Sequence, residues 1–425
     1  MKNVLIVTRD FPPYSPIIGW FIRIASLANY LASKNIDVHV LCVERKNKHN
    51  IYKLDKKIHT HTIKTLMLLY DDPKIENYRA NINTLITKII KKTLLKTNIL
   101  QIDYEQIVFN KLYEKVKNII NKYDIKNVII SSPPHSFQLL VEPLRKDYGT
   151  SVNLITDFRD PWSQRPLYHK SNQTYKEEII EHEKRIFELV NMVTVVSYGM
   201  KEYYERFGNN VCVIQNGYDV VKNISPTNIA TEFVKKAKNS NHLIIGYFGT
   251  GGIGTMDGSG KDIRFLFDCI EKNDYLKNNI SFLLQGDIRF ADKRDYKINH
   301  CVLPMMNNEQ TRSNIRLIDI GIFVYTKIED ADAVMGGKIY DYISEEKPII
   351  AFVPGKAKSL TYLANEIGGI IIIDPSNYKE VCKKLECAIE QIICAKDIKK
   401  LLPNKNKIEQ YSRINQYRMF IDLLH

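Results

Sequence analysis

Short apolar runs without polar alternation recur along this chain, and segments with helical spacing separate several of them. Such a run is typical of a parallel β-strand that is buried on both faces. Residues 4–8 (VLIVT) form the first run, a proline-rich loop follows, an amphipathic stretch extends from Phe21 to Ser33, and residues 38–42 (VHVLC) form the next run. Strand, loop, helix and strand make up the repeating unit of a doubly wound sheet. The pattern therefore predicts an α/β fold.

The runs fall into two series, one in each half of the chain. The first series continues at residues 128–130, 152–155, 193–196 and 211–214, and the second lies at residues 243–248, 281–284, 318–324, 348–352 and 370–373. A polar segment, residues 219–240, separates the two series, and a helical pattern follows Pro403. A length of 425 residues suits two domains. We expect Rossmann-like domains over residues 1–218 and 219–403, which face a ligand-binding cleft. We also expect a C-terminal helix in residues 404–425 that returns to the N-terminal domain.

The composition argues against several other classes of protein. No apolar stretch approaches the roughly 18 residues that a membrane-spanning helix needs. The N-terminal apolar run is too short for a secretory signal, and Arg9 and Asp10 interrupt it, so we expect a cytoplasmic protein. The seven cysteines include no CxxC pair, so the sequence predicts neither a structural zinc site nor a disulfide framework.

Positive charge is concentrated in the first half of the chain. Residues 1–217 hold 32 Lys and Arg against 22 Asp and Glu, whereas the remaining residues hold 29 against 26. Within residues 84–100 there is no acidic residue, and four lysines share one side of the predicted helix: Lys88, Lys91, Lys92 and Lys96. This segment is either an ordinary surface helix or a contact with an anionic membrane. No nucleic-acid-binding module is recognisable, so we expect no nucleic-acid partner.

The strongest candidate for a binding motif is GGKIYDY, residues 336–342. Paired glycines, Gly336 and Gly337, at the start of a short helix let backbone amides approach a phosphate or diphosphate at the positive helix end. Lys338 adds a positive charge in the first turn. Asp341 lies one turn into the helix, where it can accept hydrogen bonds from a ribose diol. An ordinary helix start with a solvated lysine is the alternative, but it leaves the paired glycines unexplained.

Together with this motif, two further passages resemble a GT-B glycosyltransferase of the family-4 type, and the resemblance covers essentially the whole chain. The first is the proline loop and helix from Phe11 to Ala32, and the second is VVS followed by VIQNGYD in residues 195–219. The third, residues 338–348, resembles the family pattern KxxEYLAxGKP, in which the acidic residue binds the nucleotide ribose. The resemblance implies a nucleotide-sugar donor in the second domain, an acceptor in the first, and retention at the anomeric carbon. It also implies a role in bacterial surface polysaccharide synthesis, with a glycan or lipid-linked acceptor.

The chain departs from this family at one acidic position. Many members have a glutamate eight residues before the ribose-binding residue, and this chain has Ala333 there. We expect the neighbouring Asp332 to contact a donor-sugar hydroxyl instead. Gly336 falls where the family has a glycine whose backbone faces the sugar and the diphosphate. The departure leaves the identity of the donor sugar open.

A glycine-rich run that includes Gly251 and Gly252 follows the first strand of the second domain. It is either a flexible loop or a second phosphate-binding element. The family has a lysine and an arginine in this region that neutralise the diphosphate. The resemblance implies Lys261 as the lysine and Arg264 as the nearest candidate for the arginine.

Two polar segments of the first domain, DFRDPW and SSPPHS, follow predicted strands. We expect Asp157, Arg159 and His135 to orient the acceptor or the sugar, because the carboxyl ends of parallel strands form the ligand site in such sheets. Asp160 and Gly19 are the candidates on the acceptor side. The alternative for DFRDPW is a structural ion pair between Arg159 and an aspartate.

The resemblance implies that no cofactor and no metal are required. GT-B enzymes generally neutralise the leaving diphosphate with helix ends and lysines, and catalysis is then mostly positioning and charge stabilisation. Peripheral attachment to the inner membrane face is expected if the lysine-rich segment contacts lipid. Two other functions stay open: a nucleotide-sugar epimerase on the same fold, and a non-catalytic carbohydrate-binding protein.

Overall fold

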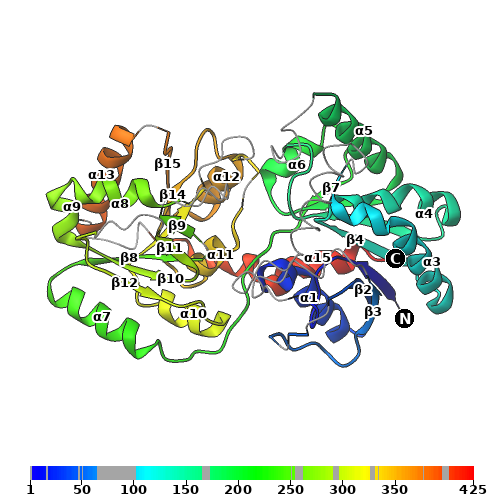
Figure 1. Ribbon diagram of the computed structural model, residues 1–425, viewed down its shortest axis with the longest axis horizontal. Helices are drawn as coiled ribbons and strands as arrows, with labels where there is room; N and C mark the ends of the chain where they lie inside the picture. Colours follow the sequence, from blue (N-terminus) through cyan, green and yellow to red (C-terminus); the bar gives the residue numbers. More distant parts are fainter. Residues whose placement is uncertain are drawn as a thin grey trace, which may run out of the picture. The chain divides into compact units, whose positions relative to one another are not determined.

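The computed structural model describes residues 2–15, 18–45, 48–49, 51–64, 102–164, 173–249, 251–253, 262–290, 296–325, 331–333, 335–376, 378–394 and 402–425. The chain forms two compact units. Unit 1 comprises Met1–Val196, Met200–Gln215 and Tyr417–His425, and unit 2 comprises Ser197–Gly199 and Asn216–Gln416. Each unit contains a parallel sheet with helices around it (Figure 1), so the predicted doubly wound α/β class is confirmed.

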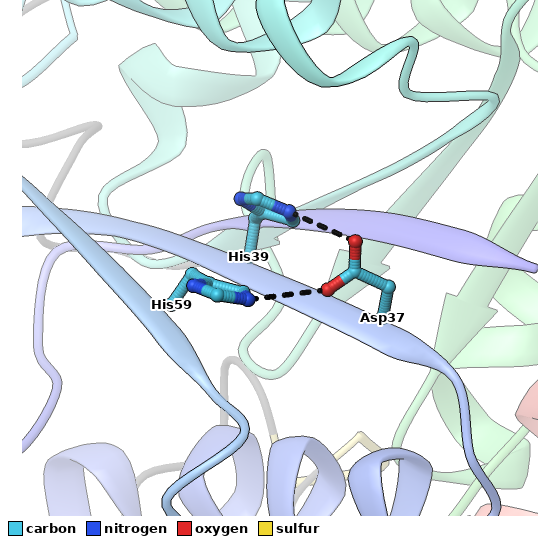
Figure 2. A group of neighbouring side chains, drawn as sticks. All are labelled: Asp37, His39 and His59. Carbon is cyan, nitrogen blue, oxygen red and sulfur yellow. Dashed lines mark hydrogen bonds and ion pairs between the residues drawn. The ribbon is translucent and has the colours of Figure 1, made fainter.

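Unit 1 is built on a seven-stranded parallel sheet with the order β3-β2-β1-β4-β5-β6-β7. Its strands are β1 (Asn3–Val7), β2 (Asp37–Glu44), β3 (His59–Lys64), β4 (Asn127–Ser132), β5 (Asn153–Phe158), β6 (Met192–Val195) and β7 (Val211–Val213). The apolar runs predicted all of these strands except β3, one of the two edge strands, whose residues are mostly exposed or half-buried. At the amino ends of β2 and β3, His39 lies opposite His59 in the register, and Figure 2 shows both rings beside Asp37.

The helices of unit 1 connect successive strands of this sheet. They are α1 (Ile18–Ser33), η2 (Tyr104–Val108), α3 (Phe109–Tyr123), η3 (His135–Leu140), α4 (Val141–Tyr148), α5 (Gln173–Leu189) and α6 (Tyr198–Tyr204). On one face, Leu27 of α1 and Phe420 near the C-terminus join the same buried cluster as Ile6 of β1. Burial of these aliphatic and aromatic side chains is the main favourable term for the unit.

The C-terminal end of the chain returns to unit 1. After α14 (Lys405–Ile408) and η6 (Glu409–Tyr411), which belong to unit 2, α15 (Arg413–Leu423) enters unit 1 at Tyr417. The Lys2 amine donates to the Leu424 carbonyl at 2.6 Å, the Asn153 amide donates to the Leu423 carbonyl at 2.8 Å, and the Tyr417 hydroxyl donates to the Arg23 carbonyl at 2.9 Å. In Figure 1 the red α15 accordingly lies beside the blue α1. The expected return of the terminal helix to the N-terminal domain is confirmed.

Unit 2 is built on a six-stranded parallel sheet with the order β12-β10-β8-β13-β14-β15. The strands are β8 (Leu243–Phe248), β10 (Ile280–Gln285), β12 (His300–Leu303), β13 (Ile320–Val324), β14 (Ile349–Phe352) and β15 (Ile370–Ile373). The short strands β9 (Gly251–Ile253) and β11 (Ile288–Phe290) pair in parallel as a separate ribbon. The helices are α7 (Asn228–Asn239), α8 (Arg264–Glu271), α9 (Asp274–Asn279), α10 (Asn308–Ile315), α11 (Gly337–Ser344), α12 (Lys358–Ile367) and α13 (Tyr378–Cys394).

Both faces of this second sheet are covered by helices. Ile245, Phe282 and Ile350 pack in one cluster with residues of α8, α9 and α13. Their chain neighbours Ile244, Leu283 and Ile349 pack in a second cluster with residues of α7, α10, α11 and α12. Successive residues of a strand point to opposite faces, so a strand buried on both sides is apolar throughout.

The structure corrects one prediction about the cysteines. Cys269 of α8 and Cys382 of α13 are joined by a disulfide, with Cα atoms 5.5 Å apart. The two residues are 113 positions apart in the sequence. Their proximity arises because both helices pack on the same face of the sheet, which residue spacing alone does not reveal.

A buried carboxyl group ties the end of the DFRDPW segment to the helices of unit 1. Glu183 of α5 has no exposed area and accepts hydrogen bonds from the Ser163 amide (3.1 Å), the Ser163 hydroxyl and the Tyr204 hydroxyl (2.8 Å). Burial raises the pKa of Glu183 to about 7, although these donors act in the opposite direction. The native protein therefore binds a proton there that the unfolded chain, with an ordinary carboxyl pKa, has already released.

Folding stability is expected to fall as the pH rises from about 4.5 to about 7, by up to the order of 3 kcal/mol from this group alone. The Glu183→Gln variant removes the titration, so its free energy of unfolding is expected to depend less steeply on pH. Urea unfolding of both proteins at several pH values between these limits measures the difference. Equal pH slopes for the two proteins would contradict the assignment. Because Asp103 also has a raised pKa, the comparison uses the difference between the variants and not the absolute slope.

Candidate functional site

The most promising site of unit 2 lies where its strand order reverses. The chain proceeds outward from β8 through β10 to β12 on one side, and from β13 through β14 to β15 on the other. Adjacent parallel strands whose connections diverge in this way leave a crevice at their carboxyl ends, where ligands of doubly wound sheets bind. The chain leaves β8 at Phe248 and enters α11 after β13, so both motifs of the second domain start at this edge.

Helix α11 begins at this edge with the two predicted glycines. Gly336 is its N-cap residue, with an extended backbone, and a Cβ atom there would lie 2.4 Å from Cε2 of Phe323. Gly337 is the first helical residue, and a Cβ atom there would meet nothing within 4 Å. The first amides of a helix lack intrahelical acceptors and, with the helix dipole, favour an anion.

Tyr342 fixes α11 against the two central strands. Its hydroxyl accepts a hydrogen bond from the Phe248 amide at 3.1 Å and lies within 3.3 Å of the Gly246 and Ile322 carbonyl oxygens. The ring fits because Gly321 has no side chain: a Cβ atom there would lie 2.7 Å from the ring. These hydrogen-bonding partners lie in β8 and in β13, the two strands on either side of the switch point. Tyr342 therefore fixes α11 relative to the carboxyl ends of both strands.

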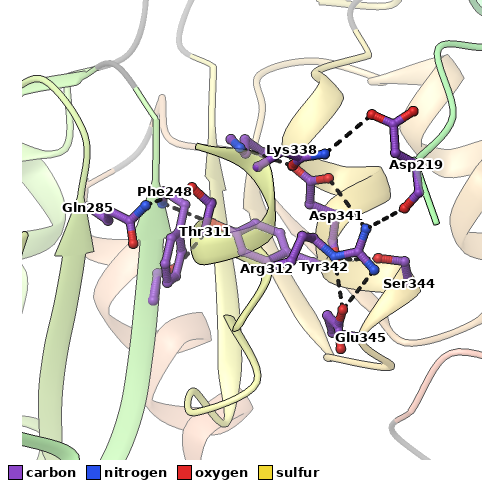
Figure 3. Close-up of polar contacts among 12 residues, drawn as sticks. Asp219, Phe248, Gln285, Thr311, Arg312, Lys338, Asp341, Tyr342, Ser344 and Glu345 are labelled. Atoms are coloured by element: carbon purple, nitrogen blue, oxygen red, sulfur yellow. Dashed lines mark hydrogen bonds and ion pairs between the residues drawn. The ribbon is translucent and has the colours of Figure 1, made fainter. Parts of the chain in front are cut away.

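Charged side chains, including those of Arg312, Lys338, Asp341 and Glu345, gather on and behind α11 (Figure 3). The Lys338 amine lies 3.0 Å from a carboxylate oxygen of Asp341. Arg312 of α10 is 4% exposed, donates twice to Glu345 at 2.7 and 2.9 Å, and lies 3.9 Å from Asp341. Asp341 and Glu345 are four residues apart on one helix face, so the arginine offsets the repulsion between them. The Asp341 side chain keeps 13% of its area exposed, and that of Lys338 keeps 37%.

The sequence missed Arg312 and Glu345 as members of this group. Arg312 lies 29 residues before Asp341, on a helix that the sequence did not predict, and only the fold brings the two together. Glu345 could have been predicted to lie beside Asp341, because residues four apart lie on the same face of a helix.

The glycine-rich run after β8 is not simply a loop. Gly251 and Gly252 lie in β9, opposite Ile288 and Arg289 of β11. Before them, Gly249 donates to the Gln285 carbonyl at 2.8 Å, and a Cβ atom on Gly286 would lie only 2.0 Å from the Gly249 oxygen. The alternative of a flexible loop is therefore wrong for the part that the structure describes. Lys261 lies outside the described residues, and the Arg264 guanidinium pairs with Asp262 at 3.0 Å.

Asp332 interacts mainly with backbone groups of α12. Its carboxylate accepts from the Lys358 amide at 3.2 Å, and its carbonyl accepts from the Ser359 amide at 3.1 Å. A Cβ atom on Gly199 would lie 1.9 Å from the same carbonyl oxygen. The carboxylate therefore helps to start α12, and its contact with a donor sugar stays a prediction.

Asp157 lies in a buried network of hydrogen bonds at the carboxyl end of β5. It is fully buried, and its two oxygens accept from Arg23 (2.8 and 3.2 Å), Thr194 (2.8 Å) and Ser131 (2.9 Å). Burial alone would raise the pKa of Asp157, but the Arg23 guanidinium beside it holds the pKa below its usual value. This carboxylate holds α1 on the sheet through Arg23, and its contact with an acceptor or sugar stays a prediction. The aspartate in the expected ion pair is therefore present, but Arg23 is its partner.

The other predicted residues of unit 1 lie close together at the carboxyl ends of β4 and β5. Arg159 donates to the backbone carbonyls of Ser132 (3.2 Å), Trp20 (2.5 Å) and Pro133 (2.9 Å). His135 has no exposed area, and Nε2 lies 3.2 Å from the carbonyl oxygen of Asp160. The burial of the His135 ring does not support direct contact with a sugar. That contact stays a prediction. Gly19 lies in the first turn of α1 and is exposed.

A cluster that the sequence missed occupies the switch point of unit 1, between β1 and β4. Arg9, two residues after β1, donates to Asp10 (2.7 Å) and Glu105 (3.2 Å), and Arg45 donates to Asp10 at 2.8 Å. Burial alone would raise the pKa of Asp10, but Arg9 and Arg45 hold it below its usual value. Arg9 and Asp10 could have been predicted as site residues, because charged residues that follow a buried strand lie at the carboxyl ends of the sheet, where ligands bind.

Asp103 lies in the same cluster and is only partly buried. It accepts hydrogen bonds from the Ser136 amide at 2.9 Å and from the Ser136 hydroxyl. Burial and the neighbouring Glu105 raise the pKa of Asp103 to about 7. A carboxyl group that titrates near neutrality beside a switch point is a frequent feature of functional sites.

In the part of the chain that the structure describes, no helix is long and apolar enough to cross a membrane. The lysine-rich segment with Lys88, Lys91, Lys92 and Lys96 lies outside the described residues. Its contact with an anionic membrane therefore stays a prediction.

No protein-family model and no curated protein matches the sequence. Solved structures do match over the full length. Sucrose-phosphate synthase from Thermosynechococcus elongatus has a TM-score of 0.64 at 13% identity, with 100% of this chain and 98% of that chain covered. HepE from Anabaena in complex with UDP has a TM-score of 0.57 at 11% identity, with 99% of each chain covered.

An α,α-trehalose-phosphate synthase (UDP-forming) from Burkholderia xenovorans in complex with glucose-6-phosphate has a TM-score of 0.59 at 9% identity, with 100% of each chain covered. At such low identities these similarities show the fold alone. That fold is GT-B, as the resemblance implied, with two parallel sheets each covered by helices.

Proposed function

We propose that this protein is a glycosyltransferase that transfers a sugar from a UDP-sugar to a hydroxyl group of a glycan or lipid-linked acceptor. The observation that most supports the proposal is the start of α11: two glycines, Lys338 and Asp341 at the switch point of unit 2 in a GT-B fold. The choice of UDP follows from structural neighbours described as UDP-bound or UDP-forming.

In this proposal the diphosphate lies against the first amides of α11. The amides and the Lys338 amine neutralise the charge that develops on the leaving UDP. Asp341 binds the ribose diol through the part of its carboxylate that is exposed, while Arg312 holds it from behind. The Lys338 amine lies 3.0 Å from the Asp341 carboxylate, so both side chains are on the part of α11 that the nucleotide contacts in this proposal.

The acceptor is assigned to unit 1, where Asp103 and Arg9 offer hydrogen-bonding groups at the switch point. Retention at the anomeric carbon is part of the proposal: the acceptor hydroxyl attacks from the side that UDP leaves, and the departing phosphate takes the proton. No metal ion takes part in this scheme, because amides and a lysine supply the positive charge. Surface polysaccharide synthesis, at or near the inner membrane face, is the proposed setting.

The test compares UDP with inorganic pyrophosphate on the full-length protein. Lys338→Ala is expected to weaken binding of both ligands, by about 10- to 100-fold, because it removes a charge-assisted contact of about 1.5–3 kcal/mol. Asp341→Asn is expected to weaken binding of UDP only, because pyrophosphate has no ribose. Isothermal titration calorimetry measures these affinities. Lys235→Ala, an exposed lysine on α7, is the control for the loss of one positive charge.

Wild-type affinity for UDP in both Lys338→Ala and Asp341→Asn would refute the assignment of the donor site. A separate assay supplies labelled UDP-sugars with and without glycan acceptors. Transfer of the label to an acceptor is the expected result. Interconversion of the UDP-sugar without acceptor would indicate an epimerase instead, and binding without turnover would indicate a carbohydrate-binding protein.

A further inference from the structure

A group of histidines lies at the amino ends of β2 and β3, whereas the switch point of unit 1 lies at the carboxyl ends of the strands. Asp37 and His39 begin β2, and His59 and His61 begin β3. The two strands are parallel, and their register places His39 opposite His59 and Leu41 opposite His61. Residues two apart in a strand point to the same face, so all four side chains share one face of the sheet.

The distances within this group suit a metal ion. His39 Nε2 lies 3.3 Å from one oxygen of Asp37, and His59 Nε2 lies 3.4 Å from the other. The three ligand atoms lie within 4.8 Å of one another. Ligands at about 2.0–2.1 Å from a tetrahedral zinc ion are about 3.3 Å apart, so small side-chain rotations would bring all three into position. Figure 2 shows both rings directed at the carboxylate.

Neighbouring groups fix the central ligand in place. His39 is 1% exposed, and its ring packs against Tyr123 of α3 at 4.3 Å between centroids. His39 Nδ1 lies 2.9 Å from His61 Nε2. When Nδ1 donates its proton to His61, the lone pair of Nε2 points toward Asp37, which is the form that binds a metal. Metal-bound histidines typically have such a partner on the second ring nitrogen.

The remaining ligands leave one side of the group open. The side chain of His59 is 57% exposed and that of Asp37 is 30% exposed. An ion can therefore enter from solvent and keep at least one water ligand. Two imidazoles and one carboxylate favour a transition-metal ion over Mg²⁺ or Ca²⁺, which prefer oxygen ligands.

We propose that Asp37, His39 and His59 form a binding site for Zn²⁺ or a similar divalent transition-metal ion that links the edge strand β3 to β2. The ion would stabilise the edge of the sheet, since a ligand that binds the folded state shifts the folding equilibrium. It would take no part in sugar transfer, because it lies at the amino ends of the strands, whereas the switch-point residues lie at the carboxyl ends.

The experiment titrates the chelator-treated, full-length protein with Zn²⁺ in the presence of a chromophoric competing chelator. We expect the His59→Ala and Asp37→Asn variants each to lose at least about tenfold in zinc affinity. His59 is exposed, so its replacement is expected to leave folding intact, which the melting temperature without zinc checks. His300→Ala, a histidine of unit 2, controls for non-specific binding and is expected to bind zinc like the wild type.

Two results would overturn the proposal. One is a wild-type protein that binds no zinc at micromolar concentrations, as expected if the histidines only donate N–H groups to the carboxylate. The other is wild-type zinc affinity in both His59→Ala and Asp37→Asn. As a second readout, zinc is expected to raise the melting temperature of the wild type and of His300→Ala but not of His59→Ala.

Discussion

Replacing Gly337 with aspartate is expected to weaken UDP binding by about 10- to 100-fold without destabilising the fold. Gly337 is the first residue of α11, and a side chain there has open space around it. An aspartate in the first turn of a helix is favourable for the helix, and α11 has no acidic residue there. The same charge repels a diphosphate that lies against the helix start. Binding and stability therefore change in opposite directions, which general damage to the protein does not produce.

Calorimetric titration with UDP measures the affinity, and thermal unfolding measures the stability. Gly337→Asn is the matched control, because it has nearly the same shape without the charge. The neighbouring glycine is unsuitable for this test, because a Cβ atom on Gly336 would collide with Phe323. If Gly337→Asp and Gly337→Asn bind UDP equally well, the diphosphate does not lie at the start of α11.

Replacing Asp157 with alanine is expected to destabilise unit 1 by about 3–5 kcal/mol, because it leaves the Arg23 guanidinium buried without its counter-ion. Arg23 is 3% exposed, and it also donates to the Gln215 carbonyl at 3.1 Å, which carries no full negative charge. Urea unfolding followed by circular dichroism measures the loss. Ser131→Ala, which removes a single hydrogen bond to the same carboxylate, is expected to cost only about 1 kcal/mol.

A double variant, Arg23→Met with Asp157→Leu, makes this test more specific. A buried ion pair is often replaceable by apolar side chains at little cost, so the double variant is expected to be more stable than Asp157→Ala. A purely catalytic aspartate would give the reverse pattern: Asp157→Ala would unfold like the wild type and lose only activity.

The sequence predicted the strands at the centres of both sheets but missed those at two edges. β8 was predicted with its observed bounds, because a strand between two neighbours is apolar on both faces. β15 is an edge strand, but its bounds were predicted as well, because all four of its residues are isoleucine. β3 and β12 were missed because each lies at the edge of its sheet, where half-exposed polar residues such as His59 and His300 interrupt the apolar pattern.

The candidate site divides in the same way. The sequence by itself determined the start of α11, since paired glycines followed by Lys338 and Asp341 are local features of one helix. Only the tertiary structure decided that Arg312 supports that helix, that Arg23 is the partner of Asp157, and that His39 lies beside His59. These contacts depend on the order and register of the strands. Many residues separated along the chain set that order together through burial of the core, and no short pattern records it.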